Sequence, residues 1–134
     1  MEPSQRSALS ILVVEDDELI RKLLQSLISM KFPDVPLFVA ENGRRGLELF
    51  KEHTPQLVIT DINMPVMDGI RMAGEIRAIK ADTRFIVVTA YDDADTIGKF
   101  EEIGFDDYIV KPIDFGKLCA AIAKCAAAIS RGEA

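Results

Sequence analysis

The sequence predicts an α/β domain in which five parallel strands, in the sheet order 2-1-3-4-5, form a doubly wound sheet with helices on both faces. Three observations lead to this fold class. Short apolar runs alternate five times with longer segments whose apolar residues recur at helical spacing. Four of the runs are continuously apolar, as is typical of parallel strands whose two faces are both covered. The runs end abruptly at polar residues, which indicates a loop after each strand.

Each expected element has a local justification. β-branched and aromatic residues mark the strands, and apolar residues three or four positions apart mark the helices. In the first helix this stripe runs from Leu19 to Ile28, with Asp17 placed to cap it. Pro33 and Pro36 mark the end of that helical region. The expected elements are, in chain order, strand 11–14, a helix over 19–28, strand 37–40, helix 43–53, strand 57–60, helix 69–80, strand 85–88, helix 93–103, strand 108–110 and a helix over 115–129.

The composition indicates one acidic domain. We expect it to span residues 9–130, between a flexible N-terminal segment (1–8) and a C-terminal tail (131–134). The 16 basic and 22 acidic residues give a net charge of −6 without a basic cluster, so direct nucleic-acid binding is not expected. The chain shows no signal-like segment and no membrane-length apolar run, and Cys119 and Cys125 have neither redox nor zinc spacing. These features predict a cytoplasmic protein without membrane attachment, whose cysteines fill the core.

Polar residues at the strand ends form the main candidate site. Glu15 and Asp16 follow the first strand, and Asp61 follows the third. Thr89 and Lys111 follow the fourth and the fifth. Ligands of such sheets bind outside the carboxyl edge where the strand order reverses, and if the order is 2-1-3-4-5 this point lies between strands one and three. Three carboxylates brought together there favour a cation such as Mg²⁺, and one of them can act as a nucleophile that forms an acyl phosphate.

The strand ends carry four motifs: VVEDD at 13–17, TDINMPVMDG at 60–69, VTA at 88–90 and DDYIVKP at 106–112. In this order and spacing they resemble the (CheY-like) receiver domain of two-component response regulators. The resemblance covers about residues 9–130 and implies a flavodoxin-like fold. It also implies a phosphoprotein that acts as a phosphoacceptor switch in phosphorelay signal transduction.

The resemblance implies a role for each acidic residue at this edge. Asp61 would accept a phosphoryl group from the phosphohistidine of a sensor histidine kinase or a histidine phosphotransfer protein. Asp16, Asp61 and the backbone carbonyl of Asn63 would bind Mg²⁺, and Glu15 would act through water. The only histidine, His53, falls at a predicted helix end, so the donor histidine would belong to a partner. The chain would not be an enzyme for another substrate, because it would catalyse only its own phosphorylation and dephosphorylation.

The resemblance also implies roles for the residues at the ends of the fourth and fifth strands in the response to phosphorylation. Thr89 would hydrogen-bond a phosphate oxygen, and Lys111 would pair with the phosphate. A cis peptide would join Lys111 to Pro112. Tyr108 would turn inward as Thr89 moves. Tyr91 flanks the cleft, where it either shields the acyl phosphate from water or is an ordinary exposed loop residue.

Switching implies an output surface formed by the fourth helix, the fifth strand and the fifth helix. A downstream protein or a fused effector domain would read this surface, or a homodimer would form through it on phosphorylation. The alternative is a phosphate sink or relay receiver, excised from a hybrid kinase or larger regulator, without an output of its own. The sequence leaves open whether the chain is a stand-alone receiver. The candidate partner contacts are Lys99, Phe100, Phe105 and Lys117.

Two features depart from the family pattern or from helix propensity. Phe105 stands where the family usually has a small residue, and it either fills a core gap, which we favour, or faces a partner. Glycines inside predicted helices, such as Gly46, Gly74 and Gly98, cost up to ~1 kcal/mol relative to alanine and therefore indicate close packing of helix on sheet. For Gly98, the alternative is a switching helix that is kept loose.

Two other function classes fit the sequence less well. A flavodoxin-like cofactor binder would have a Ser-, Thr- or Gly-rich phosphate loop after the first strand, where this chain has three acids. A Mg²⁺-dependent phosphatase with an aspartyl nucleophile would have a second Asp two residues after Asp61 as its acid and base. Asn63 stands there and cannot do that work.

Overall fold

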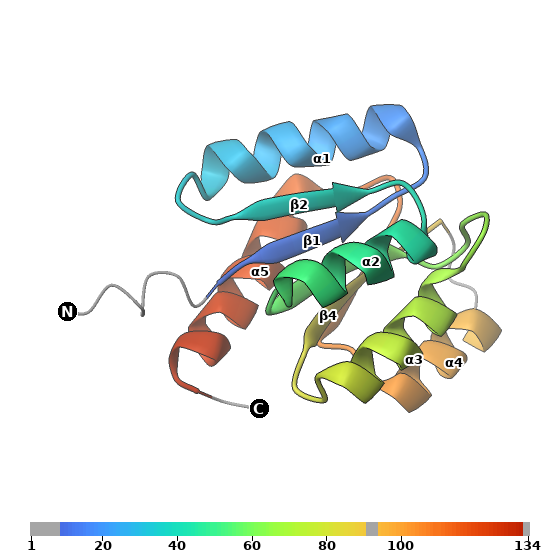
Figure 1. The fold of residues 1–134 in the computed structure, drawn as a ribbon. Coiled ribbons are helices and arrows are strands. Elements are labelled where there is room, and N and C mark those ends of the chain that lie inside the picture. Colours follow the sequence, from blue (N-terminus) through green and yellow to red (C-terminus); the bar gives the residue numbers. More distant parts are fainter. Residues whose placement is uncertain (1–8, 91–93, 133–134) are drawn as a thin grey trace.

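Five strands and five helices alternate through the residues that the structure, a computed structural model, describes: 9–90 and 94–132. The strands are parallel in the order β2-β1-β3-β4-β5, so the predicted doubly wound sheet is confirmed (Figure 1). Strand boundaries lie within one residue of the predicted ones, while the predicted flexible segment 1–8 lies outside the described residues. The elements are β1 (Ile11–Val14), α1 (Glu18–Lys31), β2 (Leu37–Ala40), α2 (Gly43–His53), β3 (Leu57–Asp61), α3 (Gly69–Ile79), β4 (Arg84–Thr89), α4 (Ala94–Ile103), β5 (Asp107–Val110) and α5 (Phe115–Ser130).

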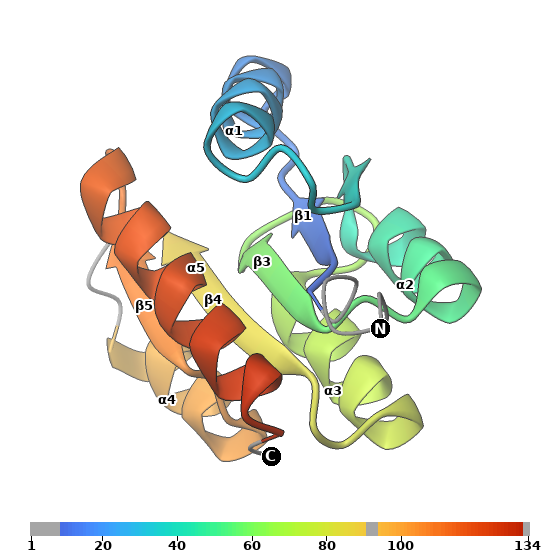
Figure 2. The same ribbon diagram turned by 90° about the vertical axis from the view of Figure 1, so that its left-hand side faces the viewer.

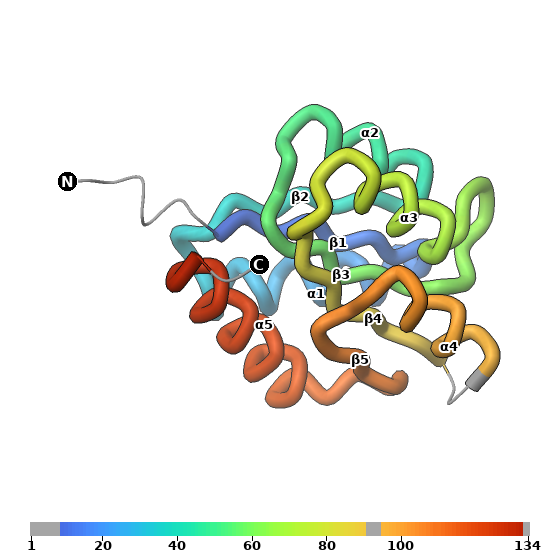
Figure 3. Tube along the Cα trace, turned by 90° about the horizontal axis from the view of Figure 1, so that it is seen from below, coloured from blue at the N-terminus to red at the C-terminus, as the bar shows by residue number. Residues whose placement is uncertain are grey.

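Helices cover both faces of the sheet (Figure 2). α1 and α5 lie on one face, and α2, α3 and α4 lie on the other (Figure 3). Alternate residues of a strand point to opposite faces, so Ile11 and Val13 pack with α1 and α5, whereas Leu12 and Val14 pack with α2 and α3. All four side chains are buried, which explains why β1 is a continuous apolar run in the sequence.

The edge strand β5 is an exception to this coverage. Tyr108 and Val110 remain 43% and 41% exposed, whereas Ile109 between them is buried on the α5 side. α4 makes its main contacts with α3 rather than with β5. The expectation that each apolar strand has both faces covered is therefore wrong for β5.

N-cap side chains fix the loops that border the carboxyl edge of the sheet. Asp17 accepts a hydrogen bond from the amide of Ile20 at the start of α1, as predicted. In α2, α3 and α5, the caps Asn42, Asp68 and Asp114 make the corresponding contact to the amide three residues on. Each of these helices is the next element after a strand, so its cap fixes the end of a loop at this edge of the sheet.

Close packing explains one helical glycine but not all of them. A Cβ atom at Gly46 would lie 2.7 Å from the Sδ of Met72 and 2.9 Å from a methyl group of Val14, so only glycine lets α2 approach β1 and α3 this closely. Among the described residues, a Cβ at Gly74 or Gly98 would meet no atom within 4 Å other than those of its chain neighbours and its own helix backbone. The packing interpretation is confirmed for Gly46 and wrong for Gly74 and Gly98.

The structure bears on two expectations drawn from composition. Cys125 is buried, Cys119 is half-buried, and both thiols are free. Burial raises the pKa of Cys125 to about 11, which keeps this thiol protonated and unreactive near neutral pH. Among the helices of residues 9–90 and 94–132, none is both long enough and apolar enough to cross a membrane.

Candidate functional site

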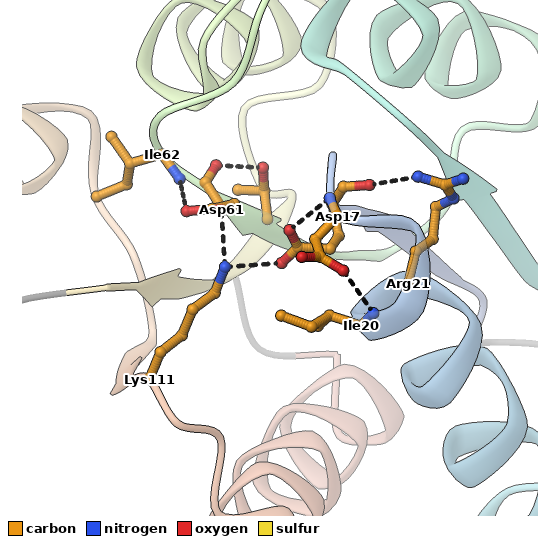
Figure 4. A network of polar contacts seen from close by, with 8 residues as sticks. Asp17, Ile20, Arg21, Asp61, Ile62 and Lys111 are labelled. Carbon is orange, nitrogen blue, oxygen red and sulfur yellow. Dashed lines mark hydrogen bonds and ion pairs between the residues drawn. The ribbon is translucent and has the colours of Figure 1, made fainter.

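Three of the predicted residues, Glu15, Asp61 and Lys111, meet at the carboxyl edge of the sheet. Figure 4 labels Asp61 and Lys111 in this network. Val14 of β1 pairs with Thr60 of β3, so the residues that follow them, Glu15 and Asp61, start from neighbouring positions. Lys111 follows β5 and reaches across to both carboxylates. This is the point where the strand order reverses, as the sequence predicted.

Lys111 and the two carboxylates form a buried ionic cluster. The Nζ of Lys111 lies 2.9 Å from the Oδ2 of Asp61 and 3.1 Å from the Oε1 of Glu15. The amide of Ile62 donates to the Oδ1 of Asp61 at 2.7 Å, and the amide of Asp17 donates to the Oε2 of Glu15 at 3.0 Å. Each of the four carboxylate oxygens therefore has a partner, although Glu15 is only 2% exposed and Asp61 only 8%.

The positive and negative charges of the cluster do not cancel. Burial raises the pKa of Glu15, and the negative charge of Asp61 adds to this, although the Asp17 amide and Lys111 oppose the shift. Burial alone would lower the pKa of Lys111, but hydrogen bonds and attraction to Asp61 and Glu15 raise it. One ammonium faces two buried carboxylates, so the site carries a net negative charge and favours an additional cation.

A third carboxylate completes a set of possible metal ligands. Glu15, Asp16 and Asp61 each offer one oxygen, and these oxygens lie within 4.8 Å of one another. Asp16 is exposed while the other two are buried, so the set has one side open to solvent. Hard oxygen ligands with room for waters fit Mg²⁺, which binds few carboxylates and keeps part of its hydration shell.

Two contacts that hold this edge were not predicted. Arg21, in the first turn of α1, donates from its Nη1 to the carbonyl of Glu15 at 3.0 Å. The amide of Gly69 donates to the carbonyl of Ile62 at 2.8 Å, and a Cβ at Gly69 would overlap the carbonyl oxygen of Asp61. Arg21 could have been suspected from its place one helical turn after Asp17. Gly69 belongs to the motif at 60–69, where it allows α3 to begin directly against the end of β3.

The other predicted site residues occupy different environments. Thr89 is buried at the end of β4, and Asn63 is exposed in the loop between β3 and α3. The peptide between Lys111 and Pro112 is cis, as predicted, and Pro112 is exposed. Tyr91 lies outside the described residues. Roles for these residues toward a phosphate or a metal remain predictions.

The expected output surface needs one correction. Lys99 and Lys117 are exposed, but Phe100 is fully buried, so its assignment as a partner contact is wrong. Its ring lies on the core side of α4, in edge contact with Phe105. Phe105 is half-buried and also meets the ring of Tyr108, which supports the interpretation that it packs.

Comparison with known proteins shows which family the chain belongs to. The family model of the response regulator receiver domain matches residues 11–123. The chain belongs to this family. The receiver domain is 36% identical over 114 residues to the chemotaxis protein CheY of Bacillus subtilis, covering 85% of this chain and 94% of that protein. Family membership assigns the chain to two-component signalling.

Other relatives are longer than the receiver domain. It is 34% identical over 117 residues to the probable C4-dicarboxylate response regulator DctR of Priestia megaterium, covering 87% of this chain but only 51% of that protein. The chain thus spans about half the length of this relative. Among solved structures, the N-terminal domain of an uncharacterised protein from Wolinella succinogenes superposes with a TM-score of 0.87 at 34% identity, over 93% of this chain and 99% of that one.

The ionic cluster predicts a large loss of stability when the Lys111 ammonium is removed. Lys111→Met leaves Glu15 and Asp61 facing each other without a counterion, so we expect roughly 2–4 kcal/mol less free energy of unfolding in urea with EDTA present. Lys22→Met is the matched control, because Lys22 pairs with Glu18 in an exposed ion pair, and we expect a loss below about 1 kcal/mol. Equal losses for the two variants would contradict the buried cluster.

Proposed function

We propose that Asp61 of this receiver domain accepts a phosphoryl group from the phosphohistidine of a sensor histidine kinase or a histidine phosphotransfer protein, and that the phosphorylated domain is a signalling switch. One observation carries this proposal. The Asp61 carboxylate lies at the carboxyl edge of the sheet, 2.9 Å from the Lys111 ammonium, with an oxygen each of Glu15 and Asp16 within 4.8 Å. A nucleophile, a cation and possible metal ligands are thereby gathered at one point.

The proposed transfer makes one bond and breaks another. A carboxylate oxygen of Asp61 attacks the phosphorus, the phosphorus–nitrogen bond breaks, and the leaving imidazole takes up a proton from solvent. The product is an acyl phosphate on Asp61. Phosphoryl transfer depends mainly on positioning and on neutralising the charge of the phosphoryl oxygens. Lys111 is held beside Asp61 before any phosphate arrives, so its charge needs little rearrangement.

The acidic set is proposed to hold Mg²⁺ during this step. Asp16, Asp61 and the backbone carbonyl of Asn63 would be the ligands, and Glu15 would act through a water. Bound there, the ion supplies positive charge that offsets the carboxylates and the phosphoryl oxygens. The net negative charge of the cluster and its open side at Asp16 support this assignment.

Phosphorylation is proposed to change the surface formed by α4, β5 and α5. The phosphoryl group adds negative charge and acceptor oxygens, toward which Thr89 and Lys111 move, and Tyr108 turns into the space that Thr89 leaves. The two states need differ by only a few kcal/mol for a phosphoryl group to reverse their populations. Lys99 and Lys117 are exposed on this surface and available for contact with a partner protein.

The partner that recognises this surface is proposed to be a downstream protein, a fused effector domain or a second copy of the receiver. The matched region is 51% of DctR, so relatives of this kind carry further sequence, which supports a fused effector. The domain itself would catalyse only the formation and hydrolysis of its own acyl phosphate. Tyr91, two residues after Thr89, would slow hydrolysis by shielding the phosphorus from water.

The phosphoacceptor is tested with a small phosphodonor. With acetyl phosphate and Mg²⁺ we expect intact-protein mass spectrometry to show one added phosphoryl group, because Asp61 is the carboxylate placed beside Lys111. Asp61→Asn should abolish the addition. Asp17→Asn is the control, since Asp17 is the exposed N-cap of α1 and asparagine caps equally well. Unchanged labelling of Asp61→Asn would refute the assignment.

The metal site is tested by thermal unfolding. Mg²⁺ binds only the folded site, so increasing Mg²⁺ should raise the Tm by mass action. Asp16→Ala should remove this rise, and it should not lower the stability of the metal-free protein, because it removes one of three mutually repelling carboxylates. Asp34→Ala removes an exposed acid in the loop between α1 and β2 and should leave the rise intact. A full Mg²⁺ response from Asp16→Ala would place the metal elsewhere.

A switch is distinguished from a phosphate sink by how far the chemical-shift changes extend from Asp61. Adding beryllofluoride, a phosphoryl mimic, with Mg²⁺ should change amide chemical shifts from Asp61 and Thr89 through α4 to β5. A sink or relay receiver without its own output would show changes confined to the loops around Asp61. Asp61→Asn, which should not bind the mimic, provides the baseline spectrum.

A further inference from the structure

A row of aromatic rings connects the core beneath α4 to the edge of the sheet. Phe85 of β4 meets Phe100 of α4 edge to face, with ring centroids 5.9 Å apart. Phe100 meets Phe105 at 6.1 Å, and Phe105 meets Tyr108 of β5 at 6.0 Å and an interplanar angle of 82°. Edge-to-face pairs at these distances are attractive beyond the area that they bury. The exposed end of the row is therefore linked to α4 through Phe105.

Tyr108 lies on the same face of the sheet as Thr89. In the parallel register, Val87 pairs with Tyr108 and Thr89 pairs with Val110. Alternate residues of a strand share a face, so Tyr108 is the diagonal neighbour of Thr89 on the side that α4 occupies. Tyr108 is nevertheless 43% exposed, whereas Thr89 is buried, so the ring of Tyr108 lies partly in solvent.

The backbone before Phe105 is anchored to α3. The guanidinium of Arg77 donates from Nη2 to the carbonyl of Gly104 at 2.8 Å and from Nη1 to the carbonyl of Thr83 at 2.6 Å. Its Cζ lies 4.9 Å from the ring centroid of Phe85, at the inner end of the aromatic row. The residue directly before Phe105 is therefore tied to α3 and to the loop that follows α3.

The residue after Phe105 is anchored to β4. The amide of Asp106 donates to the carbonyl of Phe85 at 2.8 Å, and the amide of Phe85 donates to the Oδ2 of Asp106 at 2.9 Å. Arg84 pairs with the Oδ1 of Asp106 at 2.8 Å. Because both neighbours of Phe105 are held, its ring is a fixed surface against which Tyr108 rests.

We propose that Phe105 is a positioning residue that holds Tyr108 in its outward position and thereby raises the threshold for switching. The inference rests on the proposed function, since it concerns the inward turn of Tyr108. That turn breaks the edge contact between Tyr108 and Phe105, which has no counterpart where the family's usual small residue stands. Removing the ring should therefore favour the inward state before any phosphoryl group is present.

The experiment follows Tyr108 by fluorine NMR. The chain has two tyrosines, so a Tyr91→Phe background labelled with fluorotyrosine gives one resonance, from Tyr108. Each variant is titrated with beryllofluoride at saturating Mg²⁺. We expect Phe105→Ala to shift the free-state resonance toward its position in the saturated parent, and to reach half-saturation at roughly threefold to tenfold less beryllofluoride.

Conservative variants separate positioning from general loosening of the fold. Phe105→Trp, which keeps an aromatic ring without adding a tyrosine, should behave as the parent, and Phe105→Leu, which keeps bulk without a ring, should fall between the parent and Phe105→Ala. Urea unfolding checks that each variant is folded. If Phe105→Ala does not fold, Phe105→Leu is compared with the parent instead. A merely structural role would lower stability without moving the free-state resonance toward the saturated one.

The outcomes for the two proposals are distinct. If the parent does not respond to beryllofluoride, the proposed function fails, and the inference fails with it. If the parent responds and the variants without the ring show the parent's resonance and midpoint, or need more beryllofluoride, only the positioning role of Phe105 is overturned.

Discussion

Two buried carboxylates, Glu15 and Asp61, share the single ammonium of Lys111, and the arrangement of the carboxyl edge depends on this shared ion pair. The three residues come from positions far apart in the sequence, after β1, β3 and β5. Only a parallel sheet with its order reversed between β1 and β3 brings these strand ends together. The apolar packing on both faces holds the strands in that order, and so supports a cluster whose two carboxylates would be unfavourable without Lys111.

The same cluster explains why this edge suits phosphoryl chemistry. Its carboxylate oxygens are all engaged by donors, yet its charges do not cancel, and Asp16 adds a third carboxylate on the solvent side. Burial disfavours the ionised form of Glu15 and raises its pKa, so the cluster is least favourable when every carboxylate is charged and no cation is bound. A cation and a phosphoryl group together would change that balance at Asp61. This is the physical basis for the response to phosphorylation that we propose.

The path that we propose from this edge to the surface lies on the α4 side of β4 and β5. Thr89 is buried there and Tyr108 is half-exposed, and the fixed ring of Phe105 stands between Tyr108 and the buried Phe100 of α4. α4 packs mainly on α3 and leaves β5 partly uncovered, so the ring of Tyr108 is partly exposed. The inward turn that we propose for this ring would therefore affect the helix that forms the proposed output surface.

The sequence by itself determined the elements and the residues that follow the strands at the carboxyl edge of the sheet. Continuous apolar runs are typical of strands with two covered faces, although β5 is an exception, and residues directly after parallel strands meet at one edge, so both features could be predicted from the local sequence. Only the tertiary structure decided that Lys111 bridges both Glu15 and Asp61, and that Phe100 points inward while Gly74 has open space around it. These features depend on which side chains of distant segments come within contact, and neither spacing along the chain nor residue type specifies such distances.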